Sequence, residues 1–274
     1  MDRFSGRRAL VTGAGSGIGR ATAEALADRG ADLVICDVNP ERVAEAAEAL
    51  RAKGVAVSAH TLDVSDRAAF EAFAEAVHAD GPVDILVNNA GVGVGGRLLE
   101  TPLEDWDWVM GVNLWGVIYG CHYFVPKMVE AGRGGHVINI ASAAGLTGVP
   151  SLGAYSVTKC AVVAYSEALL VELEASGVGV SVICPGFLAT RILADGRIRG
   201  AMNNPAGLSL VERVMNAPGR RPEAVAKAIV AAVEKRRFMV TLFSEARLLL
   251  VMRRLSPWAL THSKRRLLRR AVSD

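Results

Sequence analysis

The stretch Thr12-Gly13-Ala14-Gly15-Ser16-Gly17-Ile18-Gly19 joins a short apolar run, Ala9-Leu10-Val11, to a helical pattern over residues 17–29. The apolar run predicts a buried strand, so the glycines stand where a strand turns into a helix. Glycines let the backbone approach an anion closely, and the N-terminus of a helix favours negative charge. We therefore predict a phosphate-binding loop rather than a plain tight turn, with contacts from Gly13, Ser16, Gly17, Ile18 and Gly19.

The same alternation of apolar runs and helical patterns continues to residue 243. Continuous apolar strands separated by helices indicate a parallel sheet that is covered on both faces. We predict an α/β fold, a Rossmann-like doubly wound parallel sheet of about seven strands, as a single domain over residues 1–243. The strands are expected at 9–11, 33–36, 55–62, 85–87, 137–140, 180–183 and 238–243.

Polar residues follow several of these strands, where ligands of such sheets bind. Asp37 ends the second strand, and a carboxylate there would hold both hydroxyls of an adenosine ribose and repel a 2′-phosphate. This predicts NAD(H) rather than NADP(H), although Arg20 and Arg42 are close enough in sequence to leave NADP(H) open. The adenine and the rest of the dinucleotide are expected to contact Asp63, Val64, Asn89, Ala90 and Gly91.

Tyr155 and Lys159 are four residues apart on a helix predicted over 154–176, so they share one face. A free phenol, with a pKa of about 10, is a poor base at neutral pH, and a nearby ammonium lowers that pKa. Ser142 follows the fifth strand and offers a hydroxyl to position the same substrate oxygen. Asn113 lies on a long helix that the capping box Thr101-Pro102-Leu103-Glu104 is expected to open, and it could hold a water.

In this order the motifs resemble those of the short-chain dehydrogenase/reductase family, of the compact, non-extended kind. The resemblance covers roughly residues 5–243 and includes Asn88-Asn89-Ala90-Gly91 and Pro185-Gly186…Thr190. It implies an Asn113–Ser142–Tyr155–Lys159 tetrad, with Lys159 also on the nicotinamide ribose. It further implies cofactor contacts from Pro185, Gly186, Leu188 and Thr190, and a homotetramer or dimer built on helices 102–130 and 154–176.

We expect an NAD(H)-dependent oxidoreductase that interconverts a secondary alcohol and a ketone, with Tyr155 as general acid and base. Two alternatives stay open: a non-catalytic NAD(H)-binding sensor, and epimerase or dehydratase chemistry on the same scaffold. Residues 187–220 should cover the substrate, and their apolar side chains favour a lipophilic one. The same side chains could equally serve to pack this lid onto the protein.

Residues 244–274 form a basic, amphipathic C-terminal extension with eight Lys or Arg and a single acid after position 246. The pattern suits a helix on an anionic membrane surface, or one packed over the active site or a sister subunit. The net charge of +3 does not indicate a nucleic-acid partner. The cysteines are scattered and form no metal-ligand pattern, which predicts a protein without a bound metal in a reducing compartment. The sequence also shows no secretory signal and no apolar stretch of spanning length, so we expect a cytoplasmic protein. Residues 244–274 could attach that protein to the surface of a membrane.

Overall fold

The computed structural model describes residues 3–186, 188, 192, 195–199, 220–256, 258, 260–262 and 265. Its centre is a sheet of seven parallel strands in the order β3-β2-β1-β4-β6-β7-β9, which confirms the predicted doubly wound sheet. The chain builds outward from β1 in one direction and from β4 in the other, so the topology reverses between β1 and β4. The strands are β1 (Arg8–Thr12), β2 (Asp32–Asp37), β3 (Val57–Thr61), β4 (Ile85–Asn88), β6 (Gly135–Ile140), β7 (Val178–Pro185) and β9 (Met239–Leu242).

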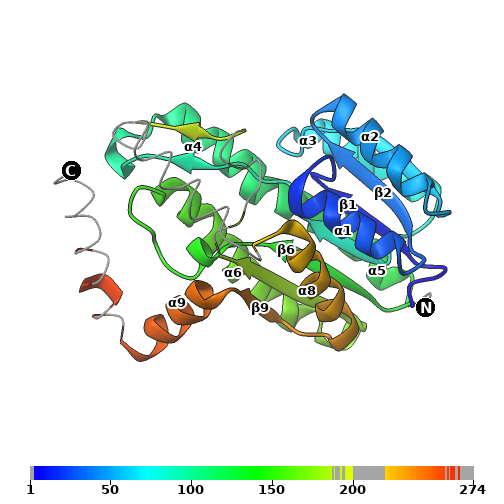
Figure 1. Ribbon diagram of the computed structural model, residues 1–274. Helices are drawn as coiled ribbons and strands as arrows, with labels where there is room; N and C mark the ends of the chain where they lie inside the picture. Colours follow the sequence, from blue (N-terminus) through cyan, green and yellow to red (C-terminus); the bar gives the residue numbers. More distant parts are fainter. Residues whose placement is uncertain are drawn as a thin grey trace.

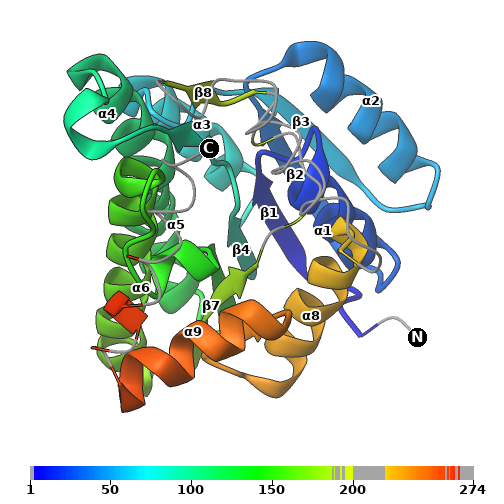
Figure 2. The same cartoon turned by 60° about the vertical axis from the view of Figure 1, so that its left-hand side comes forward.

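Two hydrophobic cores lie on the two faces of this sheet. In β1, Leu10 belongs to one core and its neighbours Ala9 and Val11 belong to the other, as expected for a strand buried on both faces. Figure 2 shows the helices α1 and α8 on one side of the sheet and α5 and α6 on the other. The first core takes side chains from α3 (Arg67–Ala79), α5 (Gly116–Glu130) and α6 (Gly153–Glu172), and the second from α1 (Gly17–Ala27), α2 (Pro40–Arg51) and α8 (Pro222–Lys235).

The predicted helix over 102–130 is present but is not uniform. It begins as α4 (Leu103–Met110), passes through a π-helical turn, η2 (Gly111–Trp115), and continues as α5. The predicted capping box is wrong, because the Thr101 hydroxyl donates to the carbonyl of Arg97 (2.9 Å) in the preceding turn instead of capping the helix. The helix predicted over 154–176 ends earlier, since α6 stops at Glu172 and a 3-10 turn, η4 (Glu174–Ser176), follows.

Two short elements lie outside the main sheet, and the sequence patterns did not predict them. Strand β5 (Val94–Gly95) pairs in parallel with β8 (Arg197–Ile198), which joins the segment after β4 to the segment before α8. After β9 the chain enters α9 (Ser244–Leu255), which runs along the outside of the molecule in Figure 1.

Helix α6 corrects one expectation from the sequence. It has 20 residues, and an 18-residue window within it has a mean hydropathy of 1.2, so by length and composition alone it could cross a membrane. In the structure α6 covers the sheet, and its side chains Val162 and Val163 belong to the first core. The exclusion of any stretch of spanning length was therefore wrong, although this helix occupies the place of a core helix.

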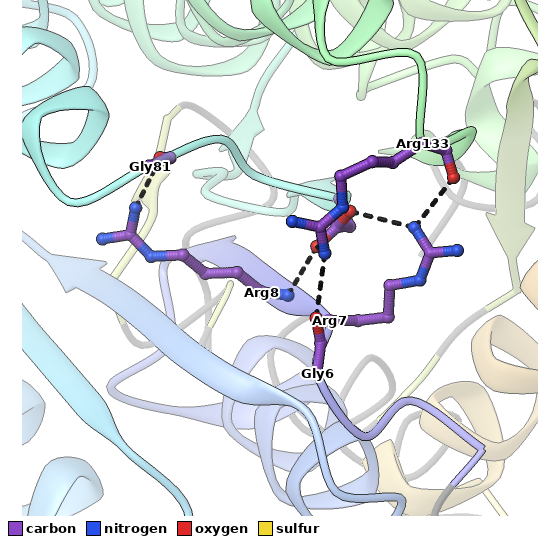
Figure 3. A network of polar contacts seen from close by, with 6 residues as sticks. Gly6, Arg7, Arg8, Gly81 and Arg133 are labelled. Atoms are coloured by element: carbon purple, nitrogen blue, oxygen red, sulfur yellow. Dashed lines mark hydrogen bonds and ion pairs between the residues drawn. The ribbon is translucent and has the colours of Figure 1, made fainter.

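A buried carboxylate joins the amino ends of β1 and β4 to the loop before β6. Asp84 accepts hydrogen bonds from the Arg8 amide (2.9 Å) and from the Arg7 (3.0 Å) and Arg133 (3.1 Å) guanidinium groups. The two guanidinium groups also donate hydrogen bonds to backbone carbonyls (Figure 3). Arg7 donates to the carbonyl of Arg133 and Arg133 donates to the carbonyl of Gly6, both at 2.9 Å. One residue thus holds three segments at the end of the sheet opposite the polar strand ends.

Replacing this carboxylate should destabilise the fold. We expect Asp84→Ala to lower the free energy of unfolding by about 3 kcal/mol, because it leaves a part-buried amide and two guanidinium groups without this acceptor. Asp80→Ala removes an exposed carboxylate 3.4 Å from Arg8 and should cost less than about 1 kcal/mol. Urea unfolding of the two variants makes the comparison, and equal losses would contradict the role of Asp84.

Candidate active site

The loops after β1 and β4 are fastened to each other where the topology of the sheet reverses. The Thr12 hydroxyl accepts from the amides of Asn89 and Ala90, both at 3.0 Å. The Asn89 side chain donates in return to the carbonyls of Thr12 (2.8 Å) and Gly13 (3.1 Å). Sequence reasoning missed Thr12, although its position as the last strand residue before the glycines could have indicated it. Ligands of such sheets bind at this reversal.

The glycine-rich loop fits a dinucleotide phosphate. Gly13 has a φ of +65°, and a side chain on it would come within 2.8 Å of the Ala90 backbone, so only glycine is accommodated. Helix α1 starts at Gly17 with Ser16 at its N-cap, and in the described structure no side chain caps it and no acid lies in its first turn. By contrast, Asn39 caps α2 and Asp66 caps α3. The first amides of α1 are thus left for an anion.

Asp37 lies at the carboxyl end of β2, above the glycine loop. Its carboxylate accepts from the amides of Gly15 (2.9 Å) and Asn39 (3.0 Å), which fixes it against the glycine loop. Its contact with an adenosine ribose stays a prediction. The two arginines that left NADP(H) open both have acidic partners. Arg20 lies 3.2 Å from Glu24, and Arg42 lies 3.0 Å from Asp195.

Asp63 and Val64 follow β3 at the same edge of the sheet. The Asp63 carboxylate accepts from the amide (2.9 Å) and the hydroxyl (2.6 Å) of Ser65, which shapes the turn. Val64 is buried, and a side chain on Gly116 would come within 2.9 Å of it. These contacts give both residues a structural part, and their contact with adenine stays a prediction.

Ser142, Tyr155 and Lys159 are brought together from β6 and α6. Ser142 follows β6 and starts the 3-10 turn η3 (Ala143–Gly145), where its hydroxyl accepts from the Ala144 amide (3.1 Å). Lys159 is buried, and its Nζ atom donates to the carbonyl of Ile140 (2.9 Å) at the end of β6. The same Nζ atom lies 5.8 Å from the centroid of the Tyr155 ring, which confirms that the pair shares one face of α6.

Burial dominates the electrostatics of this pair. It raises the pKa of Tyr155 to about 12, although a hydrogen bond with Ser142 acts in the opposite direction. Burial also lowers the pKa of Lys159 to about 8. The expectation that the ammonium lowers the pKa of the phenol is therefore wrong for this structure, because removal of the phenolate from water is the larger effect. At pH 7 the phenol is protonated and the lysine is charged.

Asn113 lies in the π-helical turn η2, and π-turns occur frequently at functional sites. Its side chain is held on both sides by Val92, accepting from the amide (2.8 Å) and donating to the carbonyl (2.9 Å). It also donates to the Thr158 hydroxyl (3.3 Å). The amide that was expected to hold a water is therefore engaged with the loop after β4, which it ties to α6.

The remaining predicted cofactor contacts follow β7. Pro185 is the last residue of β7, and the amide of Gly186 donates to the carbonyl of Leu242 (3.2 Å). Leu188 is buried in the second core. Thr190 and most of the predicted lid over 187–220 lie outside the described residues.

An ion cluster that the sequence did not predict fixes the segment before α8. Asp105 of α4 is fully buried, and it accepts from Arg197 (2.8 Å) and from two nitrogens of Arg199 (2.7 and 3.0 Å). These bonds hold the pKa of the Asp105 carboxyl below its usual range. The Arg197 guanidinium also lies 4.1 Å from the centre of the Trp108 ring. The cluster holds β8 against β5, next to the start of α6.

Comparison with known proteins agrees with this geometry. Residues 7–198 match the family model described as short chain dehydrogenase. The chain belongs to the short-chain dehydrogenase/reductase family. A member from Burkholderia phymatum, whose crystal structure is a complex with NAD, is 37% identical in sequence and superposes with a TM-score of 0.84. The superposition covers 96% of this chain and 97% of that one. The presence of NAD in that relative supports a nicotinamide cofactor for this one.

Curated members of the family are also similar. The probable oxidoreductase EphD of Mycobacterium tuberculosis is 42% identical over 260 residues, which cover 93% of this chain. The aligned region is 44% of the length of EphD, so this chain spans about half of that relative. The C alpha-dehydrogenase of a Sphingobium species is 34% identical over 257 residues, which cover 90% of this chain and 84% of that protein.

The low pKa of Lys159 predicts a pH dependence of stability. Between pH 8 and about 10 the unfolded chain keeps this proton and the folded chain releases it, so the contribution of Lys159 to stability rises with pH. We expect the free energy of unfolding of the wild type, relative to Lys159→Met, to rise by up to about 1.4 kcal/mol per pH unit above pH 8.

Urea unfolding of both proteins at several pH values measures this difference. Lys127→Met, which removes a half-exposed lysine paired with Glu130, is the control and should keep the wild-type slope. Parallel curves for the wild type and Lys159→Met would contradict a lowered pKa.

Proposed function

We propose that this chain is an NAD(H)-dependent oxidoreductase that interconverts a secondary alcohol and a ketone, with Tyr155 as general acid and base. The proposal rests on the convergence of Ser142, Tyr155 and Lys159 beside the loop after β4. A side chain on Gly91 would lie 3.3 Å from Asn113 Oδ1 and 3.4 Å from Lys159 Nζ. The charged lysine therefore lies next to the loop after β4, which is expected to contact the cofactor. The chain's membership of an oxidoreductase family supports this chemistry.

The residues present would bind a dinucleotide along the strand ends. The first amides of α1 would hold the pyrophosphate, Asp37 the adenosine ribose, and Lys159 the nicotinamide ribose. When bound, the nicotinamide supplies or accepts the hydride. The protein's own residues then move the proton.

Tyr155 is protonated at neutral pH, so it can donate its proton to the oxygen of a carbonyl that is being reduced. The charge of Lys159 stabilises the phenolate that remains, and the Ser142 hydroxyl keeps the substrate oxygen in line with the phenol. In the oxidative direction the phenolate takes the proton of the alcohol. Because burial opposes the phenolate, the charge on Lys159 matters most in that direction.

A small apolar cluster at the start of α6 supports a lipophilic substrate. Val94 of β5, Val109 of α4 and Ala154 of α6 form a small buried cluster, with Trp106 and Trp108 packed against it. Ala154 directly precedes Tyr155 in the chain, so this apolar cluster lies at the start of the helix that carries the phenol. Apolar surroundings of this kind favour an alcohol or ketone with an apolar body over a sugar.

We also infer a cytoplasmic homo-oligomer, a tetramer or dimer, that associates through α5 and α6. Trp115, at the start of α5, and Val157 and Val171 on α6 are large apolar side chains exposed to solvent. Apolar side chains gathered on one side of a protein are typical of a surface that a second subunit covers.

Loss of the phenol should abolish turnover without loss of cofactor binding. We expect Tyr155→Phe to reduce kcat by about 10²–10⁴-fold, because the ring is kept and the proton carrier is lost. A panel of steroid, retinoid, hydroxy-fatty acyl and cyclic secondary alcohols, followed by NADH absorbance, identifies a substrate for this test. NADH affinity, measured by fluorescence, should stay within about threefold of the wild type.

Tyr165→Phe, on the same helix, is the matched control and should turn over like the wild type. Near-normal turnover by Tyr155→Phe would refute the assigned role. A wild type that oxidises none of the panel but binds NADH would favour the sensor instead.

Asp37 should decide between the two nicotinamide cofactors. We expect kcat/KM to favour NAD over NADP by on the order of a hundredfold, because the buried carboxylate repels a 2′-phosphate and both nearby arginines are paired. Asp37→Ser should remove most of that preference. Asp80→Asn, before β4 at the opposite end of the sheet, should leave it unchanged, and a wild type that prefers NADP would refute the assignment.

A further inference from the structure

Helix α9 carries apolar side chains on two opposite faces. On its inner face Ala246 is fully buried, and Leu249 and Leu250 pack against the first core. The guanidinium group of Arg253 donates to the carbonyl of Leu146, next to η3, and Glu245 pairs with Arg220 (3.0 Å). These contacts fix the helix on the protein, so the orientation of its other face is set.

The outer face is apolar and uncovered. Leu248, Val251 and Leu255 follow each other at spacings of three and four residues, which places them in one line along the helix. Leu248 is 59% exposed and Leu255 is 80% exposed, and Trp258 just beyond the helix is 76% exposed. We call these four side chains the outer stripe. Among the described residues twelve large hydrophobic side chains are exposed, so a third of them gather here.

After Glu245, which pairs with Arg220, every charged side chain of α9 is positive. Arg247 and Arg254 are exposed and lie two helical turns apart on the same flank of α9, and the exposed Arg265 follows. From residue 246 to residue 273 the sequence contains no Asp or Glu. An apolar line with cationic neighbours and a tryptophan at its end matches the boundary of an anionic bilayer, where apolar side chains enter the acyl region and arginines meet lipid headgroups.

We propose that α9 docks this protein on the surface of an anionic lipid bilayer through the outer stripe, with Arg247 and Arg254 against the headgroups. The charge pattern favours a bilayer over a second copy of the chain. A two-fold contact between two outer stripes would bring their arginines together with no acid on the same helix face to neutralise them. The proposal goes beyond the proposed oxidoreductase activity and does not depend on it.

Co-sedimentation of the full chain with sucrose-loaded vesicles tests the proposal. The vesicles are of phosphatidylcholine alone, or of phosphatidylcholine with phosphatidylglycerol. We expect the wild type to pellet with the anionic vesicles and to stay in the supernatant with the neutral ones. Leu248→Ser with Leu255→Ser should lower the partition coefficient at least about tenfold, because two buried side chains are lost from the bilayer. Arg247→Gln with Arg254→Gln should weaken binding and its dependence on salt.

The matched control is Leu99→Ser with Leu103→Ser, which removes two exposed leucines near α4 and should pellet like the wild type. Circular dichroism and NADH binding report whether each variant is folded. The proposal is refuted if the folded wild type fails to pellet with anionic vesicles, or if the control loses binding as much as the stripe variant. A change in oligomeric mass on stripe substitution, with unchanged pelleting, would assign the outer stripe to a second subunit instead. Vesicle binding is scored without substrate, so it is independent of the outcome for turnover.

Discussion

The hydrogen bonds between Thr12 and the Asn89–Ala90 backbone are the constraint on which the rest of the site depends. Strands β1 and β4 are neighbours in the sheet, but the chain leaves them for opposite halves of the molecule. Without a link to the loop after β4, the glycine loop after β1 would have no hydrogen-bonded neighbour on that side. The Thr12 hydroxyl and the Asn89 side chain close that side with four bonds between 2.8 and 3.1 Å. These bonds fix the position of the glycine loop. The glycines themselves then only have to leave room for a ligand to approach the backbone.

Burial, rather than the attraction between the two side chains, sets the protonation of Tyr155 and Lys159. Burial disfavours the charged form of each group relative to the same group in water. The phenol therefore has a raised pKa and the lysine a lowered one. The carbonyl of Ile140 compensates part of the cost to the ammonium. In the proposed reaction this resting pair is suited to giving a proton, and in the reverse direction the charge of Lys159 has to offset the cost of the buried phenolate.

Most of the fold could be predicted from the sequence, because strands buried on both faces leave continuous apolar runs and the glycine loop marks the first crossover. The convergence of Ser142, Tyr155 and Lys159 followed from their places at strand ends and on one helix face. The π-helical turn at Asn113 could not be predicted, since a single extra residue in a turn leaves no periodic signal. The Asp105 cluster joins residues more than ninety positions apart, and the pKa of Tyr155 depends on how much water reaches it; local patterns carry neither kind of information.

The fastened loops at the reversal of the sheet also bear on the thermodynamics of ligand binding. A binding loop whose backbone is already held in place loses little conformational entropy when a dinucleotide binds. The affinity can then come from a modest number of contacts, and the melting temperature should climb smoothly with ligand concentration, as simple mass action requires. An enzyme built in this way can release its spent coenzyme without first unfolding part of its own frame.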